Sequence, residues 1–180
     1  MGTTAALLTV EEFLKLPEVE GEKIELIHGE VVTTSYASFG HELVKAQVNE
    51  SLVAFVLPNP IAKVFPETMY RLEEHESPQP DISVLLKERI TTSTKGLYRG
   101  APDLAIEVVS SESAGYLNTK IELYLKHGTK AVWVFYPNER QVVVHRANGQ
   151  ILKLGQDQTL EDHDVLPGFS VPMREIFAGL

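Results

Sequence analysis

The sequence contains no cysteine, which excludes structural disulfides and thiolate metal sites. It also has no apolar run near the roughly 20 residues that a membrane-spanning helix needs. Its first residues lack a basic segment followed by an apolar core, so we expect no secretory signal and a cytoplasmic location. The 180 residues show no internal repeat and no linker-like stretch. We therefore expect a single domain over 1–180.

Basic residues are scarce as well. The chain has 16 Lys and Arg against 25 Asp and Glu, for a formal net charge of −9. Generic nucleic-acid binders gain affinity by neutralising phosphates, so this balance argues against a sequence-independent binder of that kind. A nucleic-acid-binding protein with this composition would need a local source of positive charge, either metal ions or a cleft between two copies of the chain.

The apolar pattern predicts an α/β (α+β) domain built on one mixed sheet with helices over its faces. A capping-box pattern at Thr9 predicts a short helix, and 22–35 alternates about His28-Gly29 like a β-hairpin. A helix at about 115–127 separates two apolar strands, as in a βαβ crossover. We further expect a helix over 38–57, strands at 61–65, 67–72, 80–86, 103–109, 131–137, 141–147 and 150–154, a loop over 87–100, and a C-terminal loop with a short helix.

One charged residue, Glu107, interrupts the apolar run 104–109 within "GAPDLAIEVVSSES" (100–113). Glu107 lies within a predicted buried strand, where an unpaired carboxylate is unfavourable. Side chains alternate along a strand, so Asp103 shares its face, but the two lie about 13 Å apart and cannot hold one ion. Asp81, which begins the strand in "QPDISVLL" (79–86), is the better partner if the two strands are neighbours.

A lysine on the following helix completes a candidate site. Lys120 lies four residues from both Tyr116 and Tyr124, at the margin of the predicted buried face. A long side chain there can extend toward Asp81 and Glu107. Two carboxylates suit a hard divalent cation such as Mg²⁺, and a lysine beside them can position or help to deprotonate a water.

In their order along the chain, these segments resemble the Uma2 family of putative restriction endonucleases, within the PD-(D/E)xK nuclease superfamily. The resemblance covers about 8–177 and rests on "TVEEFLKLP", "IELIHGEV", "PDISVL", "PDLAIEVVSSES" and "KIELYLKHGTKAVWVFYP". It implies a restriction-endonuclease-like core of αβββαβ type and Mg²⁺-dependent hydrolysis of DNA phosphodiester bonds. It also implies that Asp81 and Glu107 bind the metal and that Lys120 is catalytic. The superfamily pattern places its lysine where this chain has Val109, so the resemblance implies that Lys120 replaces it from the next helix.

Other charged residues are weaker candidates. Superfamily nucleases sometimes take an extra acid from the start of the long helix, where this chain has His41 and Glu42. Glu25 on the hairpin is a further candidate, whereas Asp103 fits a structural role at a strand entry. The basic cluster expected near the site consists of Lys87, Arg89, Lys95 and Arg99, either as a solvated loop or as a contact for phosphates.

Three functions are compatible with these residues. The first is a Mg²⁺-dependent DNA endonuclease acting as a homodimer, with the apolar strands 131–137 and 141–147 as candidates for the interface. The second is a catalytically inactive module that keeps the nuclease fold for binding or assembly. The third is a metal hydrolase acting on another phosphoester. The sequence leaves open DNA versus RNA and Mg²⁺ versus Mn²⁺.

Overall fold

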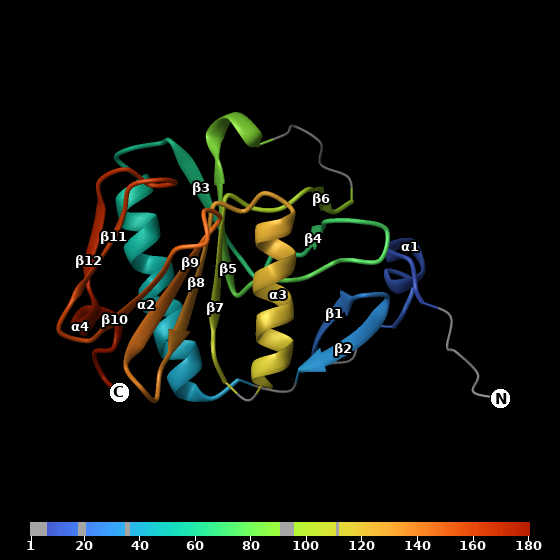
Figure 1. The fold of residues 1–180 in the computed structure, drawn as a ribbon, viewed down its shortest axis with the longest axis horizontal. Coiled ribbons are helices and arrows are strands. Elements are labelled where there is room, and N and C mark those ends of the chain that lie inside the picture. Colours follow the sequence, from blue (N-terminus) through green and yellow to red (C-terminus); the bar gives the residue numbers. More distant parts are fainter. Residues whose placement is uncertain (1–6, 18–20, 35–36, 91–95, 111) are drawn as a thin grey trace.

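A six-stranded mixed sheet forms the centre of the computed structural model, which describes residues 7–17, 21–34, 37–90, 96–110 and 112–180 (Figure 1). The strand order is β10-β9-β8-β7-β5-β3. Within it β7 and β8 are parallel, and the other neighbouring pairs are antiparallel. The strands are β3 (Ala62–Pro66), β5 (Ile82–Leu86), β7 (Leu104–Val108), β8 (Ala131–Tyr136), β9 (Gln141–Arg146) and β10 (Ile151–Gly155).

Two long helices complete the predicted αβββαβ core. Helix α2 (Phe39–Val56) precedes β3, β5 and β7 along the chain, and α3 (Ala114–Lys126) connects β7 to the parallel strand β8. The expected βαβ crossover and the mixed sheet are therefore confirmed. Among the described residues, no helix has both the length and the apolar character needed to cross a membrane.

The two faces of the sheet are covered by different elements (Figure 1). Helix α3 packs on one face through Leu117, Ile121 and Tyr124. The other face carries the larger core, made with α2, the hairpin β11 (Thr159–Asp162) and β12 (Phe169–Pro172), and α4 (Met173–Ile176). In β7 the residues Leu104, Ile106 and Val108 join this larger core, while Ala105 packs toward α3. Glu107 alternates with them and so belongs to the α3 face.

A separate hairpin lies beside α3 (Figure 1). Its strands, β1 (Lys23–Ile27) and β2 (Glu30–Thr34), meet at a tight turn in which His28 and Gly29 both have positive φ, 53° and 75°. A bridge between Leu26 and Ser77 connects β1 to the segment before β5. Leu26 also packs with the short helix α1 (Val10–Phe13) in a small satellite core. The hairpin and the capping box at Thr9 match the sequence expectations.

Three segments differ from their predictions. The expected strand 67–72 is reduced to β4 (Tyr70–Arg71), which pairs in parallel with β6 (Tyr98–Arg99) inside the expected loop. That loop also contains a 3₁₀ turn at Lys87–Arg89, and 91–95 fall outside the described residues. The expected C-terminal loop contains hairpin β11–β12, because Leu160, Phe169 and Val171 alternate with exposed residues and bury one face on the core.

The apolar strands considered for a dimer interface have a different role. Residues 131–135 of β8 are all buried, and β8 lies between β7 and β9 with both faces covered. Strand β9 buries Val142 and Val144 in the same core and is covered at its edge by β10. The burial of β8 contradicts its use as a dimer interface, because its apolar composition reflects packing within one chain; β9 keeps Val143 and His145 partly exposed.

Asp103 lies at the entry to β7, at the opposite end of that strand from Glu107. Its Oδ2 accepts a hydrogen bond of 2.9 Å from the backbone amide of Leu86, and its Oδ1 lies 3.0 Å from the Arg89 guanidinium. The side chain is buried. These contacts join the neighbouring ends of β5 and β7, in agreement with the structural role expected for Asp103.

We expect Asp103→Ala to lower the free energy of unfolding by about 1–3 kcal/mol, because the Leu86 amide loses its partner. The measurement is urea denaturation followed by the fluorescence of Trp133, the single tryptophan, which is buried in the sheet. The exposed Asp157→Ala is the control, expected within about 0.5 kcal/mol of the wild type. Equal effects of the two substitutions would contradict this role.

Candidate active site

A cavity of about 900 Å³ lies between the β1–β2 hairpin, the start of α2, and α3. It opens at the end of the sheet where β5 begins and β7 finishes. Its lining includes both predicted metal ligands, the predicted lysine and three further groups: Lys23, Glu25, His41, Asp81, Glu107 and Lys120. Residues from five separate parts of the chain therefore meet at one place.

The sheet itself brings the two predicted metal ligands together. Strands β5 and β7 are antiparallel neighbours, with Ile82 opposite Ile106. One residue further along this register, Asp81 lies opposite Glu107, on the face away from the core that holds both isoleucines. The condition that strands 80–86 and 103–109 must be neighbours is therefore met.

Asp81 is held by three donors from different elements. Its Oδ1 accepts a hydrogen bond of 3.0 Å from Lys23. Its Oδ2 accepts one of 2.8 Å from the amide of Val108 and lies 3.3 Å from Nε2 of His41. Burial alone would raise the pKa of Asp81, but the charge of Lys23 and the hydrogen bond with His41 outweigh it and hold that pKa well below its ordinary value.

Glu107 has a different environment. Nζ of Lys120 lies 2.8 Å from its Oε1 and 2.9 Å from its Oε2, and the hydroxyl of Tyr124 donates to Oε1 at 2.9 Å. Burial raises the pKa of Glu107; the charge of Lys120 offsets this only in part, and the charge of Asp81 adds to it. Lys120 is also buried, which lowers its pKa, but its carboxylate neighbours outweigh that and raise the pKa overall.

Lys120 has a second carboxylate partner in Glu25. Nζ lies 3.0 Å from Oε1 of Glu25, which also accepts a 2.6 Å hydrogen bond from the amide of Gln79. The hydroxyl of Tyr116 donates to Oε2 at 2.7 Å. Burial would raise the pKa of Glu25, but Lys120 and other donors lower it below the ordinary value. The ammonium of Lys120 therefore bridges two buried carboxylates.

The remaining candidates lie at different distances from this centre. His41 contacts Asp81, as described, and its Nδ1 lies 3.1 Å from Oε1 of Glu42. Glu42 is half exposed and pairs with Lys45 at 2.8 Å, and Lys45 in turn pairs with Glu67. Glu42 thus lies at the mouth of the cavity and His41 within it.

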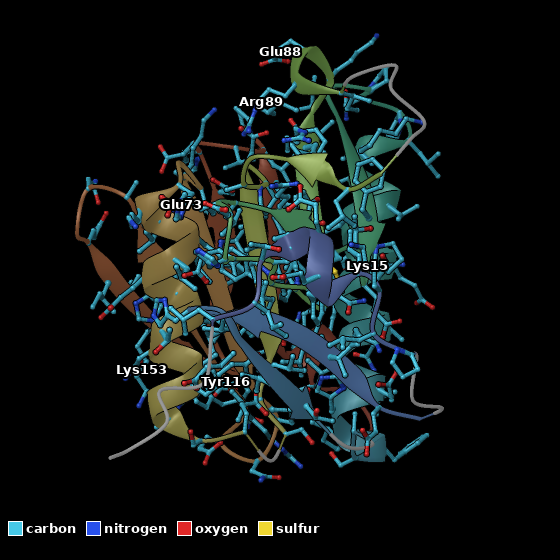
Figure 2. The ribbon with its side chains drawn as sticks, turned by 90° about the vertical axis from the view of Figure 1, so that its right-hand side faces the viewer. Lys15, Glu73, Glu88, Arg89, Tyr116 and Lys153 are labelled. Carbon is cyan, nitrogen blue, oxygen red and sulfur yellow. The ribbon has the colours of Figure 1, made fainter. Side chains whose placement is uncertain are left out.

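The basic loop is not near the site, contrary to expectation. Lys87 and Arg89 follow the far end of β5, five strand residues beyond Asp81, which is about 17 Å at the rise of an extended strand. Arg89 pairs there with Asp103. Figure 2 shows Arg89 at the top of the molecule and Tyr116 in the lower half. Arg99 does not line the cavity, and Lys95 falls outside the described residues.

The residues present fit a magnesium-type ion. Among the residues that the structure describes, no three His, Asp or Glu side chains are grouped so that they could hold an ion unaided. Asp81 and Glu107, however, present carboxylate oxygens from adjacent strands, and Mg²⁺ is commonly held by one or two carboxylates together with waters and substrate phosphates. These two residues would hold it.

Comparison with known proteins agrees with this arrangement. The model of the Uma2 family, described as "Putative restriction endonuclease", matches residues 10–174. The chain belongs to the Uma2 family. A crystal structure of a putative nuclease belonging to DUF820 from Anabaena variabilis ATCC 29413 is 28% identical with a TM-score of 0.85, covering 95% of this chain and 98% of that one. The DrdV–DNA complex matches at 11% identity and a TM-score of 0.35, covering 78% of this chain and 14% of the other, and this likeness carries no argument. No curated protein matches.

Three partners in this Uma2 site were not identified as such from the sequence: Lys23, Tyr116 and Tyr124. Strand alternation places Lys23 on the same face as Glu25, and the four-residue spacing places both tyrosines on the same face of α3 as Lys120. Those signals show shared faces. They do not show that the hairpin packs beside α3, which is the contact that brings the faces together.

The low pKa of Asp81 predicts how stability depends on pH. In the unfolded state the Asp81 carboxyl has an ordinary pKa of 3.8, so it binds a proton at a higher pH than in the folded state. The free energy of unfolding therefore falls as the pH decreases below about 4, by up to about 1.4 kcal/mol per pH unit from this group. We expect Asp81→Asn to flatten that decline, measured by urea denaturation between pH 3 and 7. Asp157→Asn controls for the loss of a carboxyl group. If the free energy of unfolding of Asp81→Asn fell with pH as steeply as that of the wild type, the low pKa of Asp81 would be contradicted.

Proposed function

We propose that the protein is a divalent-metal-dependent endonuclease that hydrolyses DNA phosphodiester bonds, with Asp81 and Glu107 as metal ligands and Lys120 as the catalytic lysine. The observation that carries the proposal is the opposition of Asp81 and Glu107 across β5 and β7, with Lys120 bonded to Glu107 inside one cavity. Membership of the Uma2 family, described as putative restriction endonucleases, supports the reaction class.

The residues of the chain divide the work in this mechanism. When bound, Mg²⁺ or Mn²⁺ supplies polarisation of a phosphoryl oxygen and a water of lowered pKa. Lys23 and His41 hold Asp81 in its ionised form, which is the form of a carboxylate that can bind a cation. Tyr124 fixes the orientation of Glu107. Lys120 holds the attacking water and stabilises the charge that develops on the phosphoryl group.

The charge of the cavity supports a requirement for metal. Its lining contains seven carboxylates and only three lysines: Glu22, Glu25, Glu42, Glu67, Asp81, Glu107 and Glu112 against Lys23, Lys45 and Lys120. A polyanionic substrate meets net repulsion there unless cations enter with it.

The lack of cysteine agrees with a cytoplasmic site of action.

The direct test is cleavage of supercoiled plasmid with Mg²⁺ or Mn²⁺. We expect nicking or linearisation that EDTA abolishes, and a loss of at least about 100-fold in each of Glu107→Ala, Asp81→Ala and Lys120→Met. The exposed Glu161→Ala and Lys153→Met are the matched controls and should cleave like the wild type. Single-stranded DNA and RNA substrates in parallel define the substrate class.

Three results would count against the proposal. Metal-dependent cleavage that survives in all three site variants would place the reaction elsewhere or in a contaminant. A wild type that neither cleaves nucleic acid nor binds Mn²⁺ would favour a catalytically inactive module. Mn²⁺ binding that is lost in Glu107→Ala, without cleavage, would favour another phosphoester as the substrate.

We also propose that the active form is a homodimer, because paired clefts would gather the few basic residues of an acidic chain around one duplex. Sedimentation equilibrium is expected to give about twice the 20.0 kDa mass of the chain. The expected products include linear plasmid formed without accumulation of nicked circles. A monomeric mass at every concentration at which the protein makes double-strand breaks would refute the dimer.

A further inference from the structure

The oxygens of the two proposed metal ligands are partnered unequally. On Asp81, Oδ2 is fixed by the Val108 amide and His41, whereas Oδ1 has Lys23 as its one hydrogen-bond partner among the described residues. On Glu107, Oε1 is contacted by both the Tyr124 hydroxyl, at 2.9 Å, and Lys120, at 2.8 Å, whereas within the same described part of the chain Oε2 has Lys120 as its one partner, at 2.9 Å. Each carboxylate thus has one oxygen held by a donor other than lysine and one covered by an ammonium group.

These two ammonium groups compete with a divalent cation. An ammonium and a metal ion on the same carboxylate oxygen repel each other, so a cation that takes Oε2 of Glu107 requires Lys120 to withdraw from it. A lysine that leaves without another partner is a buried, unpaired charge, which is strongly unfavourable. Metal binding at Glu107 therefore depends on where Lys120 can go.

Glu25 offers Lys120 that place. Glu25 is only 1% exposed, and it is fixed independently of lysine by the Gln79 amide and the Tyr116 hydroxyl. Nζ of Lys120 already lies 3.0 Å and 3.2 Å from its two oxygens, against 2.8 Å and 2.9 Å for Glu107. A small displacement would leave Lys120 paired with Glu25 alone.

We propose that Glu25 is a positioning residue that retains Lys120 in the cavity when a divalent cation takes Oε2 of Glu107, an inference that rests on the proposed metal-dependent function. Glu25 thereby allows the cation to bind and keeps the catalytic lysine within reach of the phosphate. In this role Glu25 binds Lys120 and not the cation, so it is not a third metal ligand. It is not grouped with Asp81 and Glu107 as a set that could hold an ion, among the residues that the structure describes.

The test is a double-mutant cycle read out as the Kd for Mn²⁺ by isothermal titration calorimetry, without nucleic acid. We expect Glu25→Gln to weaken Mn²⁺ binding by about 10-fold, since Lys120 then stays on Glu107. In the Lys120→Met background the same substitution is expected to change Kd by less than about threefold, because there is no lysine to retain.

Matched controls separate this effect from a general change of charge. Glu112→Gln removes one negative charge from the same cavity. The hydrogen-bond partner of Glu112 is the backbone amide of Ser110 and not Lys120. We expect it to weaken binding by less than about threefold, as for a charge screened by solvent. Tyr116→Phe, which loosens Glu25, should weaken binding in the same direction as Glu25→Gln, with Tyr136→Phe as its control. Urea denaturation of every variant verifies folding. If the Lys120 variants do not fold, the comparison of Tyr116→Phe with Tyr136→Phe tests the role of Glu25.

The outcomes discriminate among the alternatives. An equal loss from Glu25→Gln with and without Lys120 would overturn the inference and make Glu25 a metal ligand. A loss no larger than that of Glu112→Gln, or an unchanged Kd in Tyr116→Phe, would overturn it as well. In each of these cases the proposed function stands, because the wild type binds Mn²⁺. No Mn²⁺ binding by the wild type would count against the proposed function itself and would remove the inference with it.

Discussion

The buried ammonium of Lys120 is the group on which the arrangement of the site depends. It lies between Glu107, which the sheet positions, and Glu25, which the hairpin positions, and it is 3% exposed. Two carboxylates at this depth without a cation would repel each other and lose their hydration. Lys120 therefore has a structural role beside its proposed catalytic one: it allows the acidic face of the sheet and the acidic strand of the hairpin to pack against the same helix.

The acids of the site owe their different protonation behaviour to their partners. Asp81 and Glu107 occupy opposed positions on neighbouring strands, yet their pKa values are shifted in opposite directions. Asp81 has Lys23 and His41 as partners and remains ionised, whereas burial governs Glu107 despite its contact with Lys120. The less acidic carboxylate is the one that contacts Lys120, the proposed catalytic lysine. The same short register thus supplies one permanently charged group and one whose charge depends on its neighbours.

The parts of the site that alternation and spacing define could be predicted from the sequence. A continuous apolar run identified the core strand around Glu107, and the Pro-Asp entry identified Asp81. The helix spacing placed Lys120 at the edge of the buried face. The role of Lys23 could not be predicted, because the packing of the hairpin against α3 depends on contacts between distant segments. The basic loop was misplaced although its position could be predicted: it begins directly after the strand that starts at Asp81, and the length of that strand separates the two by about 17 Å.

The satellite core that holds the hairpin affects how the protein opens locally. Leu26 packs there with Val10 and Phe13 in a cluster separate from the two that hold the sheet. Small clusters of this kind open with lower free energies than the central elements of a fold. Release of the hairpin would remove Lys23 and Glu25 from their partners while the six-stranded sheet stayed intact. Local opening can therefore remove the part of the site that the hairpin carries while Asp81 and Glu107 stay in place on the sheet.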